Sequence, residues 1–314
     1  PRAFIHNQRG AVRIQSQDIE GAIRHLTYAI HLNPNLAPAY DNRGFAHMAR
    51  DDWEAALQDF NKAVHLRPGR VLSYVMRASV FAHLGRFAHA IADCDQAIQL
   101  QPGYFPAYMV RGFTHQQQGD FQAAIRDFGE SIRLRPNFVE AYLKLAEVTA
   151  RYGDRRRAIE VYDSALRMRP RFAAALAMRG FEYAMLGELD RAEADVGQAL
   201  QIAPEQPDGL YARGCLHVLA GRYPHAIQDF EVALDQRSDL PNVSAAQALA
   251  FYALGNEVNI EVAAKLWRDV IALDQRYRDP DWVQQETGWS DPLLVLARQV
   301  IAYVENTTGE EDIS

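Results

Sequence analysis

Residues 37–104 decide the fold of this chain: they read APAYDNRGFAHMARDDWEAALQDFNKAVHLRPGR (37–70) and then VLSYVMRASVFAHLGRFAHAIADCDQAIQLQPGY (71–104). The two stretches have equal length and align without a gap. A fixed period of this length predicts a stack of one repeated supersecondary unit. The same 34-residue spacing continues on both sides and places prolines at Pro34, Pro68, Pro102, Pro136, Pro170 and Pro204.

Two small-residue positions describe the repeated unit when its 34 places are numbered so that proline stands at place 32. Place 8 is always glycine or alanine, and a mid-helix glycine costs about 1 kcal/mol relative to alanine, so its recurrence indicates two helices in close contact. A glycine such as Gly85 or Gly119 marks the turn between them. The unit is predicted to be a helix–turn–helix hairpin. Place 20 is alanine at Ala22, Ala56, Ala90, Ala124, Ala158, Ala192 and Ala226.

Large residues complete the pattern, at Trp53, Phe87, Phe121 and Tyr223 and again at Phe60, Phe128, Tyr162 and Phe230. With the alanines and prolines they resemble the tetratricopeptide repeat over about residues 3–275. The resemblance implies an all-α fold, a right-handed α-solenoid (superhelix) of antiparallel hairpins. The eighth repeat carries about three extra residues, expected in its turn near 256–260. The repeats are expected near 3–36, 37–70, 71–104, 105–138, 139–172, 173–206, 207–240 and 241–277.

The repeat pattern, and with it the array of residues 1–275, stops after Gln275. Asp291-Pro292 is a good helix start because proline is tolerated in the first turn. Residues 278–304 are therefore predicted to form a linker and a C-terminal capping helix over the exposed end of the stack, and residues 305–314 a flexible tail. An amphipathic helix for a partner or a membrane is the alternative, disfavoured because the polar face lacks a lysine-rich stripe.

Arginine recurs at place 7 and aspartate at place 23 of the same repeats. The fifth repeat lacks both, since it has Leu145 and Val161 there. This joint absence predicts an Arg–carboxylate pair that joins the two helices of one hairpin; phosphate or acidic-peptide binding by the arginine row is the alternative. The expected pairs are Arg43 with Asp59, Arg77 with Asp93, Arg111 with Asp127, Arg179 with Asp195 and Arg213 with Asp229.

The resemblance also implies a concave groove lined by places 2, 5, 9, 12 and 13 of each first helix. An apolar strip of this kind usually marks a binding site, so we expect a peptide or protein segment with apolar anchors to bind there. Packing of the same aromatics between neighbouring repeats is the alternative. The candidate groove residues are Asp41, Phe45, Met48, His83, Met109, Phe113, Gln117, Glu147, Arg151, Phe181, Met185 and Tyr211.

Arg155, Arg156 and Arg157 form a local basic cluster in the fifth repeat. They could bind an acidic partner or an RNA backbone, but a solvated helix face is favoured because no exposed aromatics are interleaved. The net charge of −7 argues against general nucleic-acid binding. No apolar run exceeds seven residues, so no membrane-spanning helix is expected. Self-association of the chain is a further possible interaction.

Nothing in the sequence indicates catalysis, a metal site or a cofactor. His47, His115 and His217 recur at place 11 as packing residues, and Cys94 and Cys215 lie far apart inside helical patterns. The expected function is a non-catalytic protein–protein interaction scaffold, with a cytoplasmic location favoured. The alternative is a regulatory or targeting region of a larger enzyme, because the chain begins inside an expected helix rather than at methionine.

Overall fold

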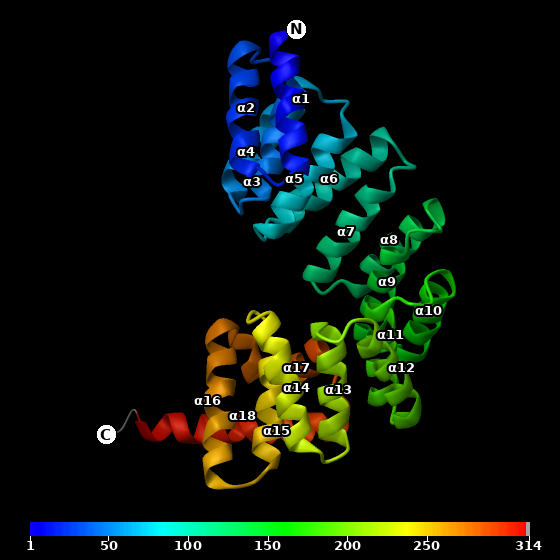
Figure 1. The fold of residues 1–314 in the computed structure, drawn as a ribbon, viewed down its shortest axis with the longest axis vertical. Coiled ribbons are helices and arrows are strands. Elements are labelled where there is room, and N and C mark those ends of the chain that lie inside the picture. The colour runs from blue at the N-terminus through cyan, green and yellow to red at the C-terminus, as the bar shows by residue number, and fades with distance from the viewer. Residues whose placement is uncertain (312–314) are drawn as a thin grey trace. The chain divides into compact units, whose positions relative to one another are not determined.

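The computed structural model describes the backbone of residues 1–311 and the side chains of residues 1–307; the last part of the expected tail, residues 312–314, lies outside this range. The described chain is built of helices that pair into successive antiparallel hairpins (Figure 1). Their bounds are α1 (Arg2–Gln15), α2 (Ile19–Leu32), α3 (Ala37–Met48), α4 (Trp53–Leu66), α5 (Val71–His83), α6 (Phe87–Leu100), α7 (Phe105–Gln117), α8 (Phe121–Leu134), α9 (Val139–Arg151), α10 (Arg155–Met168), α11 (Ala173–Met185), α12 (Leu189–Ile202), α13 (Pro207–Leu219), α14 (Tyr223–Gln236), α15 (Pro241–Ala253), α16 (Glu257–Leu273), the 3₁₀ turn η1 (Gln275–Arg278), α17 (Pro280–Thr287) and α18 (Asp291–Glu311).

The chain divides into two compact units. Unit 1 spans Pro1–Ala141 and contains α1 to α8 with the start of α9; unit 2 spans Tyr142–Ser314 and contains the rest of α9 and the helices that follow. Within each unit a hairpin packs on the next one along the sequence, as α2 does on α3 and α14 on α15. Each unit is therefore a short stack of hairpins, and its core grows with each repeat.

Short local signals start and stop the helices of a hairpin. The Asp120 side chain accepts a hydrogen bond of 3.0 Å from the Ala123 amide and caps the start of α8. Gly85 has φ +69° at the turn after α5, a left-handed conformation that favours glycine. The first two turns place Gln17 (φ 61°) and Asp51 (φ 58°) in the same conformation. These two turns therefore carry strain that the later ones avoid.

The glycines at place 8 let the two helices of a hairpin approach each other closely. A Cβ atom added to Gly44 would lie 2.9 Å from the Phe60 ring, and one added to Gly214 would lie 2.3 Å from the Phe230 ring. Both rings are fully buried, and so are the alanines at place 20. A side chain added at Gly44 or Gly214 would therefore displace the core ring of the facing helix.

The C-terminal elements of unit 2 pack on several hairpins. α18 contacts both helices of the last hairpin, α15 and α16, and also reaches α13, the first helix of the preceding hairpin. It is helical through Glu311 and includes most of the expected tail. The extra residues of the eighth repeat lengthen α16 to 17 residues, compared with 14 in α14, instead of enlarging its turn. None of the described helices is both long and apolar enough to cross a membrane.

Candidate functional site

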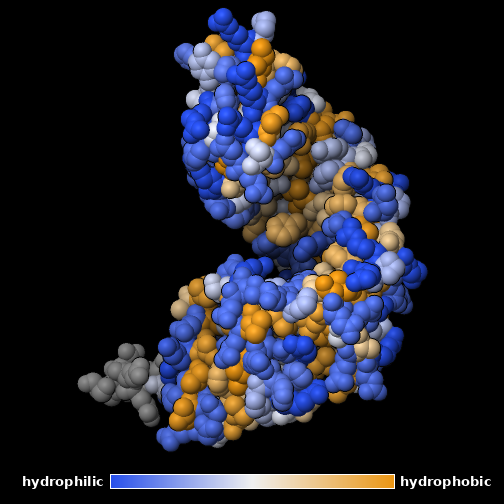
Figure 2. Space-filling model, in the orientation of Figure 1, coloured by the Kyte–Doolittle hydropathy of each residue, from blue (hydrophilic) through white to orange (hydrophobic). Residues whose placement is uncertain are grey.

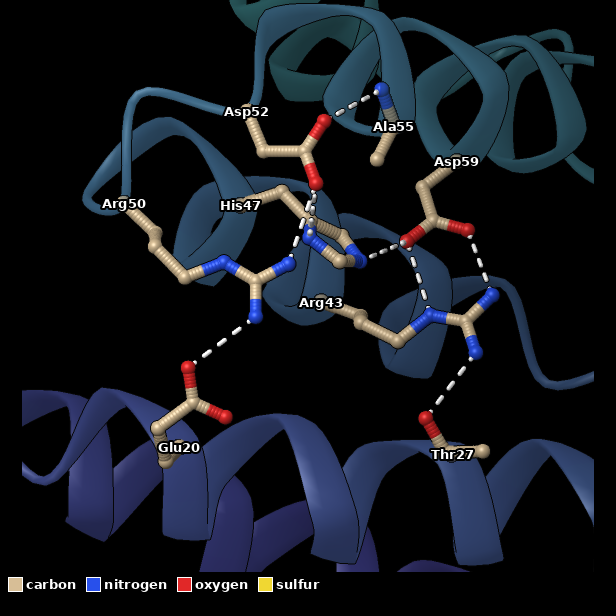
Figure 3. Close-up of polar contacts among 8 residues, drawn as sticks. All are labelled: Glu20, Thr27, Arg43, His47, Arg50, Asp52, Ala55 and Asp59. Atoms are coloured by element: carbon tan, nitrogen blue, oxygen red, sulfur yellow. Dashed lines mark hydrogen bonds and ion pairs between the residues drawn. The ribbon is translucent and has the colours of Figure 1, made fainter.

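An arginine clasp joins the two helices of a hairpin (Figure 3). Arg43 of α3 donates from Nε to Asp59 Oδ2 at 2.8 Å and from Nη2 to Asp59 Oδ1 at 2.7 Å. Its third nitrogen, Nη1, donates to the Thr27 hydroxyl on α2 at 3.1 Å. The hydrogen bonds to Asp59 raise the pKa of Arg43 above its usual value. One guanidinium therefore joins three helices from two consecutive repeats.

The same clasp recurs in the other repeats that have both residues. The Nε and Nη2 atoms bind both carboxylate oxygens of the place-23 aspartate at 2.6–2.9 Å. In Arg77, Arg111 and Arg179 the Nη1 atom also donates to the side chain at place 25 of the preceding repeat. The sequence analysis did not predict this bond. A polar residue at place 25 was the signal that could have shown it. The clasps are Arg77 with Asp93 and Asn61, Arg111 with Asp127 and Asp95, Arg179 with Asp195 and Asp163, and Arg213 with Asp229.

Histidines at place 11 lie beside three of these clasps. Nε2 of His47 is 3.8 Å from Asp59, and Nε2 of His217 is 3.6 Å from Asp229. Burial lowers the pKa of both histidines, although the neighbouring aspartate opposes the shift. Burial therefore favours the neutral form of His47 and His217, which lie half-buried between the two helices of their hairpins.

The inner-face positions, meaning places 2, 5, 9, 12 and 13 of the first helices, are partly open in unit 1. Phe45 on α3 is 46% exposed and Phe113 on α7 is 41% exposed. His83 is exposed and stacks on Trp53, with ring centroids 3.6 Å apart. Asp41 differs from the expectation of a groove residue. It is buried, and Arg70 and Ser73 bind its carboxylate. Among the other candidates of unit 1, Gln117 is exposed, and Met48 and Met109 are half-buried.

The same positions are covered in unit 2, contrary to the expectation of an exposed strip. Phe181 is 4% exposed and Met185 is 6% exposed, because the chain's own C-terminal segment lies on them. The Trp289 indole N–H donates to the Tyr211 hydroxyl at 2.9 Å, and the Ser290 amide donates to Met185 Sδ at 3.3 Å. We call Glu286–Ser290 the strap. It occupies the inner face that the sequence assigned to an outside partner.

Two arginines of the fifth repeat bind this strap. Arg151 donates to the Glu286 carboxylate, and Arg155 donates to the Gly288 carbonyl oxygen. Arg155 also donates to Glu182 Oε2 at 2.6 Å. The proposed acidic-partner cluster is therefore not a continuous patch, because Arg155 is already bonded inside unit 2. Of its other members, Arg156 lies 3.4 Å from Glu188 and Arg157 is exposed, while the candidate Glu147 pairs with Lys144 at 2.8 Å.

Comparison with known families identifies the repeats. One model of the tetratricopeptide repeat matches residues 42–105 and 178–241, and a second matches residues 115–180. The chain belongs to the tetratricopeptide repeat family. Its hairpins are the repeats of an all-α solenoid, as the sequence predicted. No curated protein matches the chain.

Solved structures agree on the fold. A tetratricopeptide repeat protein from Parabacteroides merdae matches with a TM-score of 0.67 and 19% identity over 79% of this chain and 98% of that one. The type IV pilus biogenesis factor PilW matches with a TM-score of 0.61 and 20% identity, over 66% of this chain and 96% of its own. PilF of Pseudomonas aeruginosa matches with a TM-score of 0.57 and 18% identity, over 66% and 95%. At these identities the likeness concerns the fold alone.

Proposed function

We propose that this protein is an interaction scaffold whose unit 1 inner face binds a polypeptide segment carrying apolar side chains. Arrays of this family are typically non-catalytic scaffolds for protein partners. A difference between equivalent side chains in the two units of the chain supports the site within unit 1.

The comparison concerns phenylalanine at place 9. Phe45 and Phe113 in unit 1 are 46% and 41% exposed, whereas Phe181 at the same place in unit 2 is 4% exposed. Two neighbours cover Phe181: Tyr211 of the next repeat stacks on its ring, with ring centroids 5.5 Å apart, and Gly288 of the strap lies beside it. Phenylalanine at place 9 is thus covered by polypeptide in unit 2 and partly exposed to solvent in unit 1. A bound segment would bury Phe45 and Phe113 in the same way.

Other exposed apolar side chains of unit 1 fall on the same positions. Phe4 and Leu72, both at place 2, are 56% and 37% exposed. Figure 2 shows hydrophobic side chains over α5–α7 on the visible face of unit 1. Among the described side chains of unit 2, none of the large exposed apolar residues lies at an inner-face position of α11, α13 or α15. Exposed apolar side chains that recur at inner-face positions support a protein-binding role.

A photo-cross-linking amino acid at position 45 or 113 tests the proposal. We expect both positions to cross-link to one and the same polypeptide from the native host extract, and mass spectrometry of the cross-linked peptide should show an apolar segment. Position 100 is the matched control, because Leu100 on the second helix α6 is 40% exposed but is not an inner-face residue. Equal cross-linking at position 100, or no cross-link at 45 and 113, contradicts the proposed site.

A further inference from the structure

The strap of unit 2 is held by side chains that break the repeat pattern. Arg155 stands at place 17, and Glu182 stands at place 10. The other repeats have large apolar residues at place 17 and small, apolar or neutral residues at place 10. The residues at place 17 are Ile19, Trp53, Phe87, Phe121, Leu189 and Tyr223, and those at place 10 are Val12, Ala46, Val80, Thr114, Val148, Leu216 and Ala250.

Stacking of the repeats does not need these two charges. Glu182 is 6% exposed, and its burial raises the pKa of the carboxyl group, although Arg155 opposes the shift. A buried ion pair of this kind is a weak source of stability, since similar apolar residues often serve the fold as well or better. Residues that break a local rule without such a gain are characteristic of functional sites.

The contacts made by these side chains are those of peptide recognition. Arg155 binds a backbone carbonyl oxygen, that of Gly288, while Glu182 holds its guanidinium from the other side. Arg151 binds the side-chain carboxylate of Glu286. The Arg155–Glu182 pair thus binds the backbone of the strap. Arg151 binds an acidic side chain that precedes the indole of Trp289 by three residues.

An aromatic pocket receives that indole. Trp289 is 1% exposed, and its N–H binds the Tyr211 hydroxyl at 2.9 Å. Tyr211 stacks on Phe181 with ring centroids 5.5 Å apart. A buried tryptophan with its N–H satisfied is the typical anchor of a protein interface. α18 follows directly and places Leu293 and Leu294, both at most 2% exposed, against the same core.

We propose that the inner face of unit 2 is a second polypeptide-binding site, which the chain's own strap occupies. The ligand class is a segment with a carboxylate side chain, a tryptophan three residues later and then an apolar helix. The strap is its built-in example, and a segment of the same chemistry from another protein would replace it. This site is separate from the one proposed in unit 1.

The test uses the full chain with a protease recognition site inserted between Arg278 and Asp279, which are both exposed. After cleavage we expect unit 2 to keep its helix content and the cut segment to stay bound. A fluorescent peptide with the sequence of residues 280–304 should then exchange into the site, followed by anisotropy. If the cut segment does not exchange, or if cutting unfolds unit 2, the strap is part of the core and the proposal is wrong.

Competing peptides test the ligand chemistry. We expect the peptide with Trp289→Ala to compete at least about tenfold less well, because it lacks the interface anchor. The peptide with Gln299→Ala is the matched control and should compete like the natural sequence, since Gln299 is exposed. Equal competition by the two variants overturns the assigned indole pocket.

A double substitution in the array tests the charged pair. Arg155→Leu with Glu182→Leu places at both positions the apolar residue that a sibling repeat already has there, so the fold is expected to persist. Thermal unfolding checks that the fold is kept. We expect the labelled peptide to bind this protein several-fold more weakly. Unchanged affinity in a folded double variant would show that the pair does not serve the site.

Discussion

Removing Asp59 from its clasp is the sharpest test of what holds a hairpin together. The Asp59 carboxylate is 6% exposed and receives two charge-assisted hydrogen bonds, of 2.8 and 2.7 Å, from Arg43, which is 21% exposed. Breaking a buried ion pair typically costs about 3–5 kcal/mol. Arg43 would keep its bond to the Thr27 hydroxyl and some access to water. We therefore expect Asp59→Ala to lower the free energy of unfolding by about 3 kcal/mol, at the lower end of that range.

The fifth repeat supplies the compensating change. It has Leu145 and Val161 where the five clasp-bearing repeats have arginine and aspartate, so an apolar pair is compatible with this hairpin. Arg43→Leu combined with Asp59→Val removes both charges together and leaves no unpaired charge, while the Thr27 hydroxyl, which loses its bond to Arg43, is exposed to water. Replacing a buried pair by apolar residues of similar size is often neutral. The double variant should therefore recover most of the lost stability.

The assay is urea unfolding followed by circular dichroism, with hydrogen exchange of the α3 and α4 amides to report on the local hairpin. Hydrogen exchange matters because repeat arrays do not always unfold in one step. If Asp59→Ala lowers the free energy of unfolding by less than about 0.5 kcal/mol, as expected for an exposed ion pair, the predicted loss of about 3 kcal/mol is refuted. A double variant no more stable than the single one would refute the pairing argument itself.

Three further predictions follow from the turns, the helix contact and the buried imidazoles. Gln17→Gly and Asp51→Gly should each stabilise the protein by about 0.5–1 kcal/mol in urea unfolding, because both residues have positive φ; a loss of stability would contradict the strain. Gly214→Ala should destabilise by about 1–3 kcal/mol, because its Cβ would meet the Phe230 ring at 2.3 Å; unchanged stability would contradict the close packing. Burial lowers the pKa of His47 in the folded protein, so the stability it contributes is present above its ordinary pKa of about 6.5 and declines as the pH falls below that value. His47→Phe should flatten this part of the pH–stability curve, and an equally steep curve in the variant would remove His47 as the cause.

The periodic part of the fold was readable from the sequence because every repeat uses the same contacts. The pairing of places 7 and 23 could be inferred from the fifth repeat, which lacks both residues. The bond from Arg43 back to Thr27 was not predicted, because it joins two consecutive repeats and the joint absence in the fifth repeat concerns a single hairpin. It was nevertheless readable, since place 25 carries a polar residue in the repeats that precede Arg43, Arg77, Arg111 and Arg179, whereas the repeat before Arg213 has Gly197 there.

The covered inner face of unit 2 was not readable in the same way. Trp289 and Gly288 lie after the period has ended, so no spacing rule connects them with Tyr211 or Arg155. The sequence placed Arg155 in a basic cluster, with a solvated face favoured, but its partners Glu182 and Gly288 lie 27 and 133 residues further along the chain. Contacts of that kind depend on how a non-repeating segment folds back, and a single sequence carries no periodic signal for them.

The three-helix clasps of unit 1 have a mechanical consequence for its inner face. The pitch of a solenoid follows from the small rotation between successive repeats, and Arg43, Arg77 and Arg111 each fix one such rotation with a planar, rigid guanidinium. The clasps thereby keep the spacing between Phe45 and Phe113 constant. Lysine at these positions would keep the positive charge, but its flexible side chain would not fix the rotation between successive repeats. The fit of a partner could therefore be tuned by residues that never touch it.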